Sequence, residues 1–362
     1  MEKGAIGWKG DWSESRRRLA AWWRGEVPDR PALSLMAPRV RPIEDIPAFE
    51  APADLYSRWI LAEYRINVAE REMASTQYLG EAFPYFDTHI GPGSLALFLG
   101  SEPIFADTTV WYQPCIPDEG LSKPLEFDVG NKWWKSQVRL VEEGVKHSRG
   151  RYLVCMPDLI EGLDTLSSLR GKKQLLLDLR RRSDFVHEKL SEINGLYFQY
   201  FDEIRKIISD DVGGNCFSAF RIWGPGRTAK LQCDFSAMIS PAMFKEFVAP
   251  YLAEQCEKLD CSVYHLDGTD CVRHLDALLG ISGLKAIQWT PQSGRPGTGS
   301  ATWFEMYKRI LGAGKSLLLL DVEPHEVKPL LHSIGTKGVL IATTARTIDE
   351  AQKLLQWTEG LR

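Results

Sequence analysis

Long apolar runs are missing from this sequence, and so is any marked excess of charge of one sign. No stretch of about 18 apolar residues occurs, which argues against a helix that spans a membrane. The 44 Lys and Arg residues nearly balance the 48 Asp and Glu residues, and the net charge of −4 gives little attraction for nucleic acid or anionic lipid. The first 23 residues are charged every few positions and lack the apolar centre of a secretory signal. We therefore expect a cytoplasmic protein with no nucleic-acid or membrane partner.

Cysteine pairs at metal or redox spacing are also missing. The seven cysteines are an odd number, are spread along the chain and include no C-x-x-C pair. This excludes the common zinc-ribbon and thioredoxin-like signatures. Most of the cysteines sit among apolar residues, so we expect buried, reduced thiols and no disulfide framework.

Short apolar runs alternate with longer amphipathic segments through most of the chain. In 172–210, for example, Leu, Phe, Val and Ile recur at intervals of three and four residues, which predicts helix. Thr347 and Glu350 form a capping box that predicts another helix start. The predicted helices include 172–210, 240–259, 302–314 and 347–361, and the predicted strands are 31–38, 151–157, 216–224, 261–268, 284–291, 316–322 and 337–344.

This alternation predicts an α/β protein with a parallel sheet, since parallel strands need long crossover connections that are usually helical. The even repeat of the last four units favours a single (β/α)8 TIM-type barrel over an open sheet. The region 40–150 is less regular and rich in Pro, Gly and aromatic residues, so we expect it to supply early barrel units and long loops over the C-terminal mouth. We expect one domain over 1–362, with an N-terminal helical extension at 1–30 and the barrel at 31–362.

Polar and aromatic residues stand at or just after the ends of the predicted strands. In a (β/α)8 barrel these positions converge at one mouth, where the active sites of such barrels lie. We expect substrate-binding residues there. These are Arg39, Asp87, His89, Glu161, Arg221, Trp223, Tyr264, Gln288 and Trp289.

Three residues at this mouth are candidates for catalysis: His265, Asp267 and Asp158. His265 and Asp267 are two residues apart on a predicted strand, so their side chains point to the same side. An imidazole beside a carboxylate forms an acid–base couple whose proton affinity the neighbouring charge adjusts. The competing interpretation is a buried His265 that is hydrogen-bonded to a backbone carbonyl.

Several of the binding candidates have equally simple structural roles. Arg221 and Trp223 alternate along a predicted strand and are both expected to point inward, where they would hold an anion over an aromatic face. A packed Trp beside an ion-paired Arg fits the same pattern. Gln288 and Trp289 are adjacent, so only one of them lines the barrel interior. Asp87 and His89, in a Gly/Pro-rich loop, fit an ordinary turn as well as a site.

Four segments resemble the uroporphyrinogen decarboxylase superfamily, which includes zinc-dependent methyltransferases that move methyl groups between corrinoids and thiols. They are PDLIEGLDTLSSLRG (157–171), ISPAMFKEFVAPYL (239–252), VYHLDG (263–268) and DVEPHEV (321–327). The resemblance covers about 150–355 and, more weakly, 30–110. It implies a (β/α)8 barrel, a small-molecule substrate and a corrinoid-carrying partner protein, and it leaves a homodimer open.

The sequence departs from this family where the family binds its metal and its acidic substrate. Asp267 stands where the methyltransferases have the Cys of H-x-C-G, and the last predicted strand ends in Thr343 and Thr344 instead of a Cys ligand. Without these thiolates we expect no thiol-activating zinc site and no metal, unless a third ligand joins His265 and Asp267. The candidates for such a ligand are Glu161, Cys233 and Asp234.

The resemblance and these departures leave three functions. The favoured one is an enzyme that acts on a small substrate in the mouth, by methyl transfer with a corrinoid partner. The second is a decarboxylase of uroporphyrinogen or a related acid, with Arg39, Arg41 or Arg221 as carboxylate clamps and Asp87 in place of the family's pyrrole-binding Asp. The third is a ligand-binding barrel without catalysis.

Overall fold

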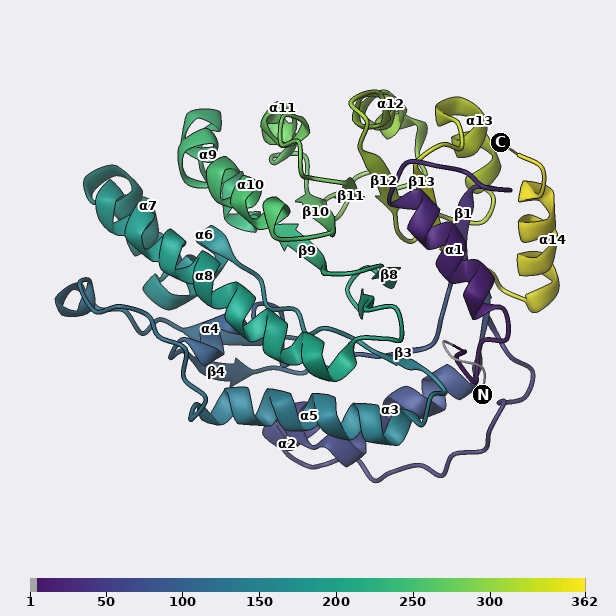
Figure 1. Cartoon of the computed structure of the whole chain (residues 1–362), viewed down its shortest axis with the longest axis horizontal. Coiled ribbons are helices and arrows are strands. Elements are labelled where there is room, and N and C mark those ends of the chain that lie inside the picture. Colours follow the sequence, from purple (N-terminus) through teal and green to yellow (C-terminus); the bar gives the residue numbers. More distant parts are fainter. Residues whose placement is uncertain (1–4, 362) are drawn as a thin grey trace.

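The computed structural model describes residues 5–361 (Figure 1). A seven-stranded sheet lies at the centre, with the strand order β2-β1-β13-β12-β11-β10-β9, and all neighbouring strands are parallel except β1 and β2. The α/β class with a mostly parallel sheet is therefore confirmed. The strands are β1 (Ala32–Pro38), β2 (Thr76–Gly80), β9 (Thr228–Gln232), β10 (Cys261–Asp267), β11 (Ala286–Thr290), β12 (Ser316–Leu319) and β13 (Val339–Thr344).

Shorter strand pairs occupy the side of the molecule between β2 and β9. They are β3 (Tyr85–Phe86) with β6 (Leu153–Val154), β4 (Glu102–Phe105) with β5 (Val110–Gln113), and β7 (Asn215–Phe217) with β8 (Ile222–Gly224). A single bridge between Met156 and Phe217 joins the β6 and β7 segments. Within residues 5–361 the strand pairing does not run continuously around a ring. The arrangement is compatible with a TIM-type fold, and a closed barrel is not detected.

The prediction of one continuous strand at 216–224 is wrong, because the structure has an antiparallel hairpin there. Arg221 adopts a left-handed backbone conformation, with φ of 52°, and its N–H donates to the carbonyl of Ser218. An extended chain cannot continue through such a turn, so β7 ends before Arg221 and β8 runs back beside it.

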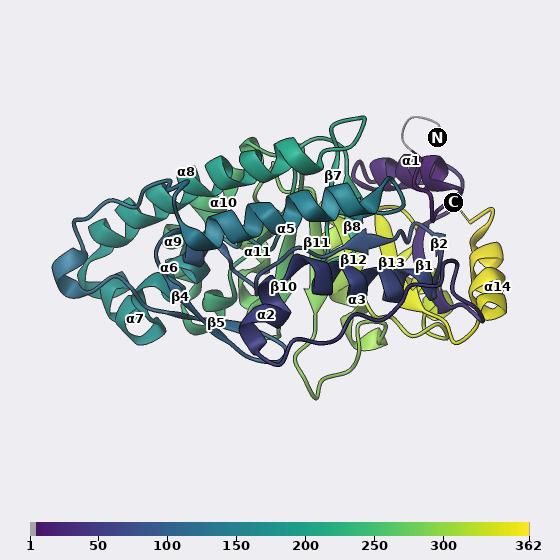
Figure 2. The same cartoon turned by 90° about the horizontal axis from the view of Figure 1, so that it is seen from below.

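Helices cover the sheet, and the long helices α5 and α8 pack side by side (Figures 1 and 2). The predicted helix 172–210 is divided into α7 and α8, and 240–259 into α9 and α10. No helix of the described part of the chain is long and apolar enough to cross a membrane. The helices are α1 (Trp12–Trp22), α2 (Leu55–Ile60), α3 (Ala62–Ala74), α4 (Leu95–Phe98), α5 (Lys132–Ser148), α6 (Gly162–Arg170), α7 (Lys172–Arg181), α8 (Ser183–Ile208), α9 (Pro241–Phe247), α10 (Ala249–Glu257), α11 (Leu275–Leu279), α12 (Phe304–Gly312), α13 (Val327–Ile334) and α14 (Ile348–Thr358).

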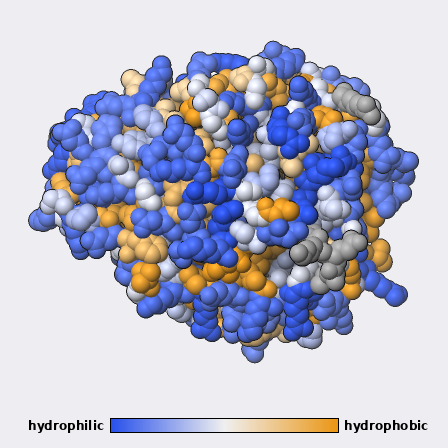
Figure 3. Space-filling model, in the orientation of Figure 1, coloured by the Kyte–Doolittle hydropathy of each residue, from blue (hydrophilic) through white to orange (hydrophobic). Residues whose placement is uncertain are grey.

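The core lies between this helical layer and the sheet. Strands β11 and β12 are buried almost throughout, as expected of strands that are covered on both faces. Trp289 of β11 packs against Trp303 in the short 3-10 helix η4 (Ala301–Trp303), with their ring centroids 5.1 Å apart. The face of the molecule in Figure 3 is mostly hydrophilic, with scattered hydrophobic residues.

The helix predicted in the N-terminal extension is α1, and it packs against the amino ends of β12 and β13. The indole N–H of Trp22 lies 3.0 Å from the carbonyl oxygen of Gly338 and 3.3 Å from that of Leu317. The Ser316 hydroxyl donates back to the Trp22 carbonyl. The amino ends of these strands are therefore covered, and the carboxyl ends are left for a site.

Candidate functional site

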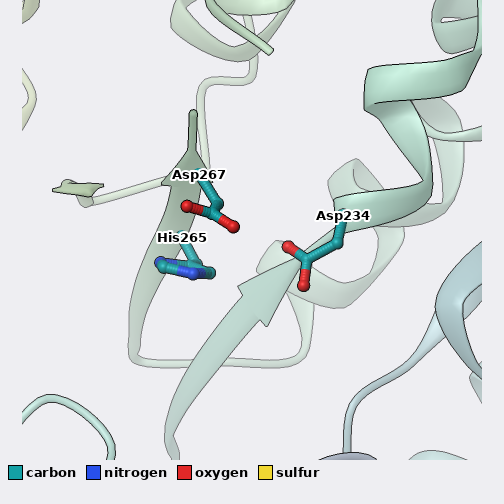
Figure 4. Close-up of side chains that lie close together, drawn as sticks. All are labelled: Asp234, His265 and Asp267. Atoms are coloured by element: carbon teal, nitrogen blue, oxygen red, sulfur yellow. The ribbon is translucent and has the colours of Figure 1, made fainter. Parts of the chain in front are cut away.

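Three side chains meet at the carboxyl ends of β9 and β10: Asp234, His265 and Asp267. Each offers one oxygen or nitrogen atom, and these three atoms all lie within 4.8 Å of one another. In Figure 4, His265 and Asp267 extend from the same side of β10, and Asp234 approaches from just beyond the neighbouring strand. We call these three residues the acidic triad.

Hydrogen bonding determines which nitrogen of His265 carries its proton. The side-chain amide N–H group of Gln288 donates to the carbonyl of Trp289 at 2.7 Å and to the Thr290 hydroxyl at 2.9 Å. This leaves the amide oxygen of Gln288 facing Nδ1 of His265, to which it is hydrogen-bonded. Because that oxygen can only accept, Nδ1 must carry the proton, and Nε2 of a neutral ring keeps its lone pair.

The surroundings of His265 favour this neutral form. Burial lowers the pKa of His265, and the positive charge of Lys230 lowers it further, against the opposing influence of Gln288 and the nearby carboxylates. The ring also packs against Phe220 from the β7–β8 hairpin, with ring centroids 5.4 Å apart. At neutral pH the imidazole is therefore a lone-pair donor.

Asp234 holds its proton unusually strongly for a carboxyl group. Although part of the residue faces solvent, burial of the carboxyl group raises its pKa to about 7, and the negative charges of Asp164 and Asp267 add to the effect. Like charges held this close disfavour simultaneous ionisation. A cation bound between these carboxylates would remove that repulsion.

Asp158 and Lys230 form an ion pair beside the acidic triad. The Lys230 ammonium lies 2.6 Å from the Asp158 carboxylate and donates to the side-chain oxygen of Gln232 at 2.5 Å. The amide N–H group of Gln232 in turn donates to Asp164 at 3.1 Å and Asp234 at 3.2 Å. The one lysine in this network is thus engaged by Asp158, one of the predicted catalytic residues.

Glu161 is fully buried next to this network. One of its oxygens accepts a hydrogen bond from the backbone N–H of Gln232 at 2.8 Å, and the other has no partner. Burial raises the pKa of Glu161 to about 8. The side chain is therefore protonated at neutral pH and supports the backbone of β9 as a neutral group.

Asp87 and His89 form a second polar pair, after β3. Nδ1 of His89 lies 2.7 Å from the Asp87 carboxylate, and Arg65 donates to the backbone carbonyls of both residues. Burial opposes ionisation of Asp87, but His89 and Arg65 outweigh it and lower its pKa to about 2. This pair makes no hydrogen bond or ion pair with the acidic triad among the described residues.

Arg221 and Trp223 do not share an inward face, contrary to the prediction. Arg221 lies in the turn between β7 and β8 and pairs with Asp321 at 3.3 Å. Trp223 is buried, donates its indole N–H to Asp210 at 2.9 Å, and packs against Trp12 of α1. The pattern of alternation was misleading because the hairpin breaks the strand.

Among the described residues, Gln288 is the one remaining predicted binding residue that is hydrogen-bonded to the acidic triad. Trp289 packs against Trp303 of η4, whereas Gln288 bonds to His265, so Gln288 is the member of that pair on the side of the triad. Tyr264 is buried and alternates with His265 along β10, so it points away from the triad. The Arg39 side chain donates to the carbonyl of Thr76 at the start of β2.

The residues that sequence reasoning missed come from β9. This strand reads TAKLQ and was not recognised, because Lys and Gln interrupt its apolar pattern. It contributes Lys230 and Gln232, and it leads directly to Asp234, which had been considered only as one of three alternative metal ligands. The alternation of apolar Ala229 and Leu231 with polar neighbours is the signal that could have identified this strand.

The chain is similar in fold to a protein of known structure. No protein-family model matches the chain, and no curated protein matches it in sequence. Among solved structures, a methyltransferase from Methanosarcina mazei is similar, with a TM-score of 0.60, and the match covers 95% of this chain and 97% of that chain. The two sequences are 14% identical. This similarity shows that the two proteins share a fold.

Proposed function

We propose that the protein is an enzyme that transfers a methyl group to or from a small substrate, at a divalent metal ion held by the acidic triad. The single observation that carries the proposal is the approach of Asp234, His265 and Asp267, and His265 has a free lone pair on one ring nitrogen. The fold of the Methanosarcina mazei methyltransferase supports methyl transfer as the reaction class. The sequence motifs support a TIM-type barrel related to uroporphyrinogen decarboxylase and a corrinoid-carrying partner.

The residues of the acidic triad fit a metal ion of a particular kind. Two carboxylates and one neutral imidazole suit ions such as Mn²⁺, Fe²⁺ or Zn²⁺. The hydrogen bond from Nδ1 of His265 to Gln288 orients the imidazole, as metal-binding histidines require. Cys233 is not part of the triad, so no thiolate is offered. A bound divalent ion acts as a Lewis acid that lowers the pKa of a coordinated nucleophile.

The protein's own groups prepare the substrate for the transfer. The methyl group moves as a cation equivalent: the donor atom keeps the electron pair of the broken bond, and the acceptor supplies the pair of the new bond. Asp234 and Asp267 would hold the ion as carboxylates, because a bound cation offsets the repulsion that helps to raise the pKa of Asp234 in its absence. Asp158 holds the Lys230 ammonium in the network beside the triad.

Decarboxylation of an acidic substrate fits the geometry less well. Two of the three arginines expected to clamp carboxylates are engaged elsewhere, Arg221 by Asp321 and Arg39 by a backbone carbonyl, and the third, Arg41, is exposed. The acidic triad itself would repel carboxylates. No observation favours this alternative.

Metal titration tests the proposal directly. Protein stripped with a chelator should bind one equivalent of Mn²⁺ or Zn²⁺ by isothermal titration calorimetry, and His265→Ala and Asp267→Asn should abolish or strongly weaken this binding. The matched control is Asp270→Asn, because Asp270 is exposed and lies three residues beyond Asp267, outside the triad. Absence of metal binding by the wild-type protein, or equal binding by His265→Ala, would contradict the proposal.

Methyl transfer is tested with methylcobalamin and a panel of thiol and amine acceptors. We expect loss of the methyl–cobalt absorption in the presence of the wild-type protein and at least a hundredfold slower loss with His265→Ala. Unchanged methylcobalamin with every acceptor, in protein that binds metal, would rule out the corrinoid part of the proposal.

A further inference from the structure

A cavity of about 450 Å³ adjoins the acidic triad and shares Asp234 with it. It lies between β5, helix α6 and the 3-10 helix η2 (Asp234–Met238). This volume is within the range of about 300–1,000 Å³ that small-molecule sites occupy. We call it the side chamber; the lining residues used below are Trp111, Tyr112, Ile160, Phe235, Asp164 and Asp234.

The walls of the side chamber are aromatic and aliphatic. Trp111 is 60% exposed, which is unusual for a residue of its size. The Tyr112 hydroxyl donates to the carbonyl of Ile90 at 3.4 Å, and Gly91 and Gly93 allow the ring to lie close to the backbone. Both residues therefore line the side chamber, and these contacts fix the position of the Tyr112 ring.

The charged groups on the wall shared with the acidic triad are carboxylates. The oxygens of Asp164 accept hydrogen bonds from the backbone N–H groups of Asp234 and Phe235, each at 2.8 Å, and from the amide of Gln232. All three donors are neutral, and within residues 5–361 neither Asp164 nor Asp234 has an ion-pair partner. Lys172, which also lines the chamber, is exposed to solvent.

This combination selects one class of ligand. Anions are repelled by the carboxylates, and a hydrated metal ion gains nothing from apolar walls. A primary ammonium needs several hydrogen-bond acceptors, whereas three donors already occupy most of the accepting positions of Asp164. A methylated onium ion has a positive charge, an apolar exterior and no need of hydrogen bonds, and aromatic faces attract such cations.

We infer that the side chamber binds a methylated onium ion, such as a quaternary ammonium group, with its charge toward Asp164 and Asp234 and its methyl groups against Tyr112 and Trp111. The inference rests on the proposed function in one respect: it takes the side chamber as the substrate's part of the same site.

Binding of tetramethylammonium tests the inference. We expect saturable binding by calorimetry or ligand-observed NMR, and binding at least fivefold weaker for the neutral isostere 2,2-dimethylpropan-1-ol. Tyr112→Leu and Trp111→Ala should each weaken tetramethylammonium binding roughly 2- to 30-fold, the range expected for loss of one cation–π contact. Phe49→Leu is the control, because Phe49 is an exposed aromatic residue outside the chamber.

The outcomes separate this inference from the proposed function. Absence of saturable binding, equal binding of the neutral isostere, or wild-type affinity in both folded chamber variants would overturn it, even if the acidic triad binds metal. Onium binding that Tyr112→Leu weakens would support it, even if metal titration fails. Thermal unfolding of each variant checks that it is folded.

Discussion

The tautomer of His265 depends on its neighbour Gln288. The amide oxygen of Gln288 fixes the proton on Nδ1, so removal of this acceptor frees the imidazole to rotate and to change tautomer. We expect Gln288→Leu to weaken metal binding by roughly 10- to 100-fold, the usual effect of losing such a partner. Calorimetric titration of the metal-free variant measures this.

Two control variants accompany Gln288→Leu in the metal titration. Gln288→Glu keeps an acceptor oxygen at the same position and should retain most of the affinity. Gln352→Leu makes the same change as Gln288→Leu at an exposed site on α14 and should have no effect. Equal metal affinity in Gln288→Leu and the wild type would show that the hydrogen bond does not orient the ring.

Glu161 makes the stability of the protein depend on pH. Burial raises its pKa from an ordinary 4.5 to about 8, so between these values the folded state binds more protons than the unfolded state. Stability from this group is fully present below pH 4.5 and is lost as the pH rises toward 8, by at most about 1.4 kcal/mol per pH unit. We expect Glu161→Gln to flatten the decline in the free energy of unfolding between pH 5 and 8, measured by urea titration at each pH. An identical pH slope in both proteins would mean that Glu161 is ionised in the folded state.

The sequence was informative about the site wherever a residue stood at the end of a recognisable strand. His265, Asp267 and Gln288 were all identified in this way, since β10 and β11 have clear apolar patterns. Asp234 could be named only as one option among three, because the strand before it was not recognised. The contacts that set the protonation of these groups are between distant segments, and no local pattern contains them.

At the scale of single elements, long apolar strands were predictable and short or interrupted ones were not. Strands β10, β11 and β13 lie within the ranges expected for them, whereas β6 contains only two residues of the seven expected. The hairpin at Arg221 and the antiparallel strand β2 depend on backbone turns that propensity does not specify. Whether such a segment forms a strand depends on its tertiary contacts more than on the strand propensity of its residues.

Gly80 determines how β2 ends against β1. Its φ is +59°, and a Cβ atom at this position would lie 2.0 Å from the carbonyl oxygen of Leu33 in β1. Because the clash is with the backbone, a rotamer change cannot relieve it. We expect Gly80→Ala to lower the free energy of unfolding by several kcal/mol, measured by urea denaturation.

Gly25→Ala is the matched control for this substitution. Gly25 has a φ of +69° and nothing within 4 Å of its Cβ position, so alanine there carries only the cost of the left-handed backbone, about 1–2 kcal/mol. Similar losses in the two variants would show that β2 shifts to accommodate the side chain.

At the scale of the whole molecule, the amino ends of the parallel strands pack against helix α1 and the carboxyl ends carry the acidic triad. Helix α1 closes the amino ends of β12 and β13 through Trp22, and Trp23 donates its indole N–H to the carbonyl of Trp223 in β8 at 3.0 Å. The acidic triad lies at the carboxyl ends. The sequence predicted α1 as an extension, but its burial against three strands makes it part of the core. The sequence indicated a helix in this extension and could not show its docking position.

This division predicts that stability and metal binding can be changed separately. Trp22 is 1% exposed and shares its indole N–H between the carbonyls of Leu317 and Gly338, so Trp22→Ala leaves a large cavity and removes these contacts. We expect a loss of about 3–5 kcal/mol in the free energy of unfolding. Trp111→Ala, at a site that is 60% exposed, should change the free energy of unfolding by less than about 0.5 kcal/mol.

Because the triad is at the other end of the strands, folded Trp22→Ala should bind metal with unchanged affinity. A loss of affinity in the folded variant would show that α1 also controls the geometry of the mouth.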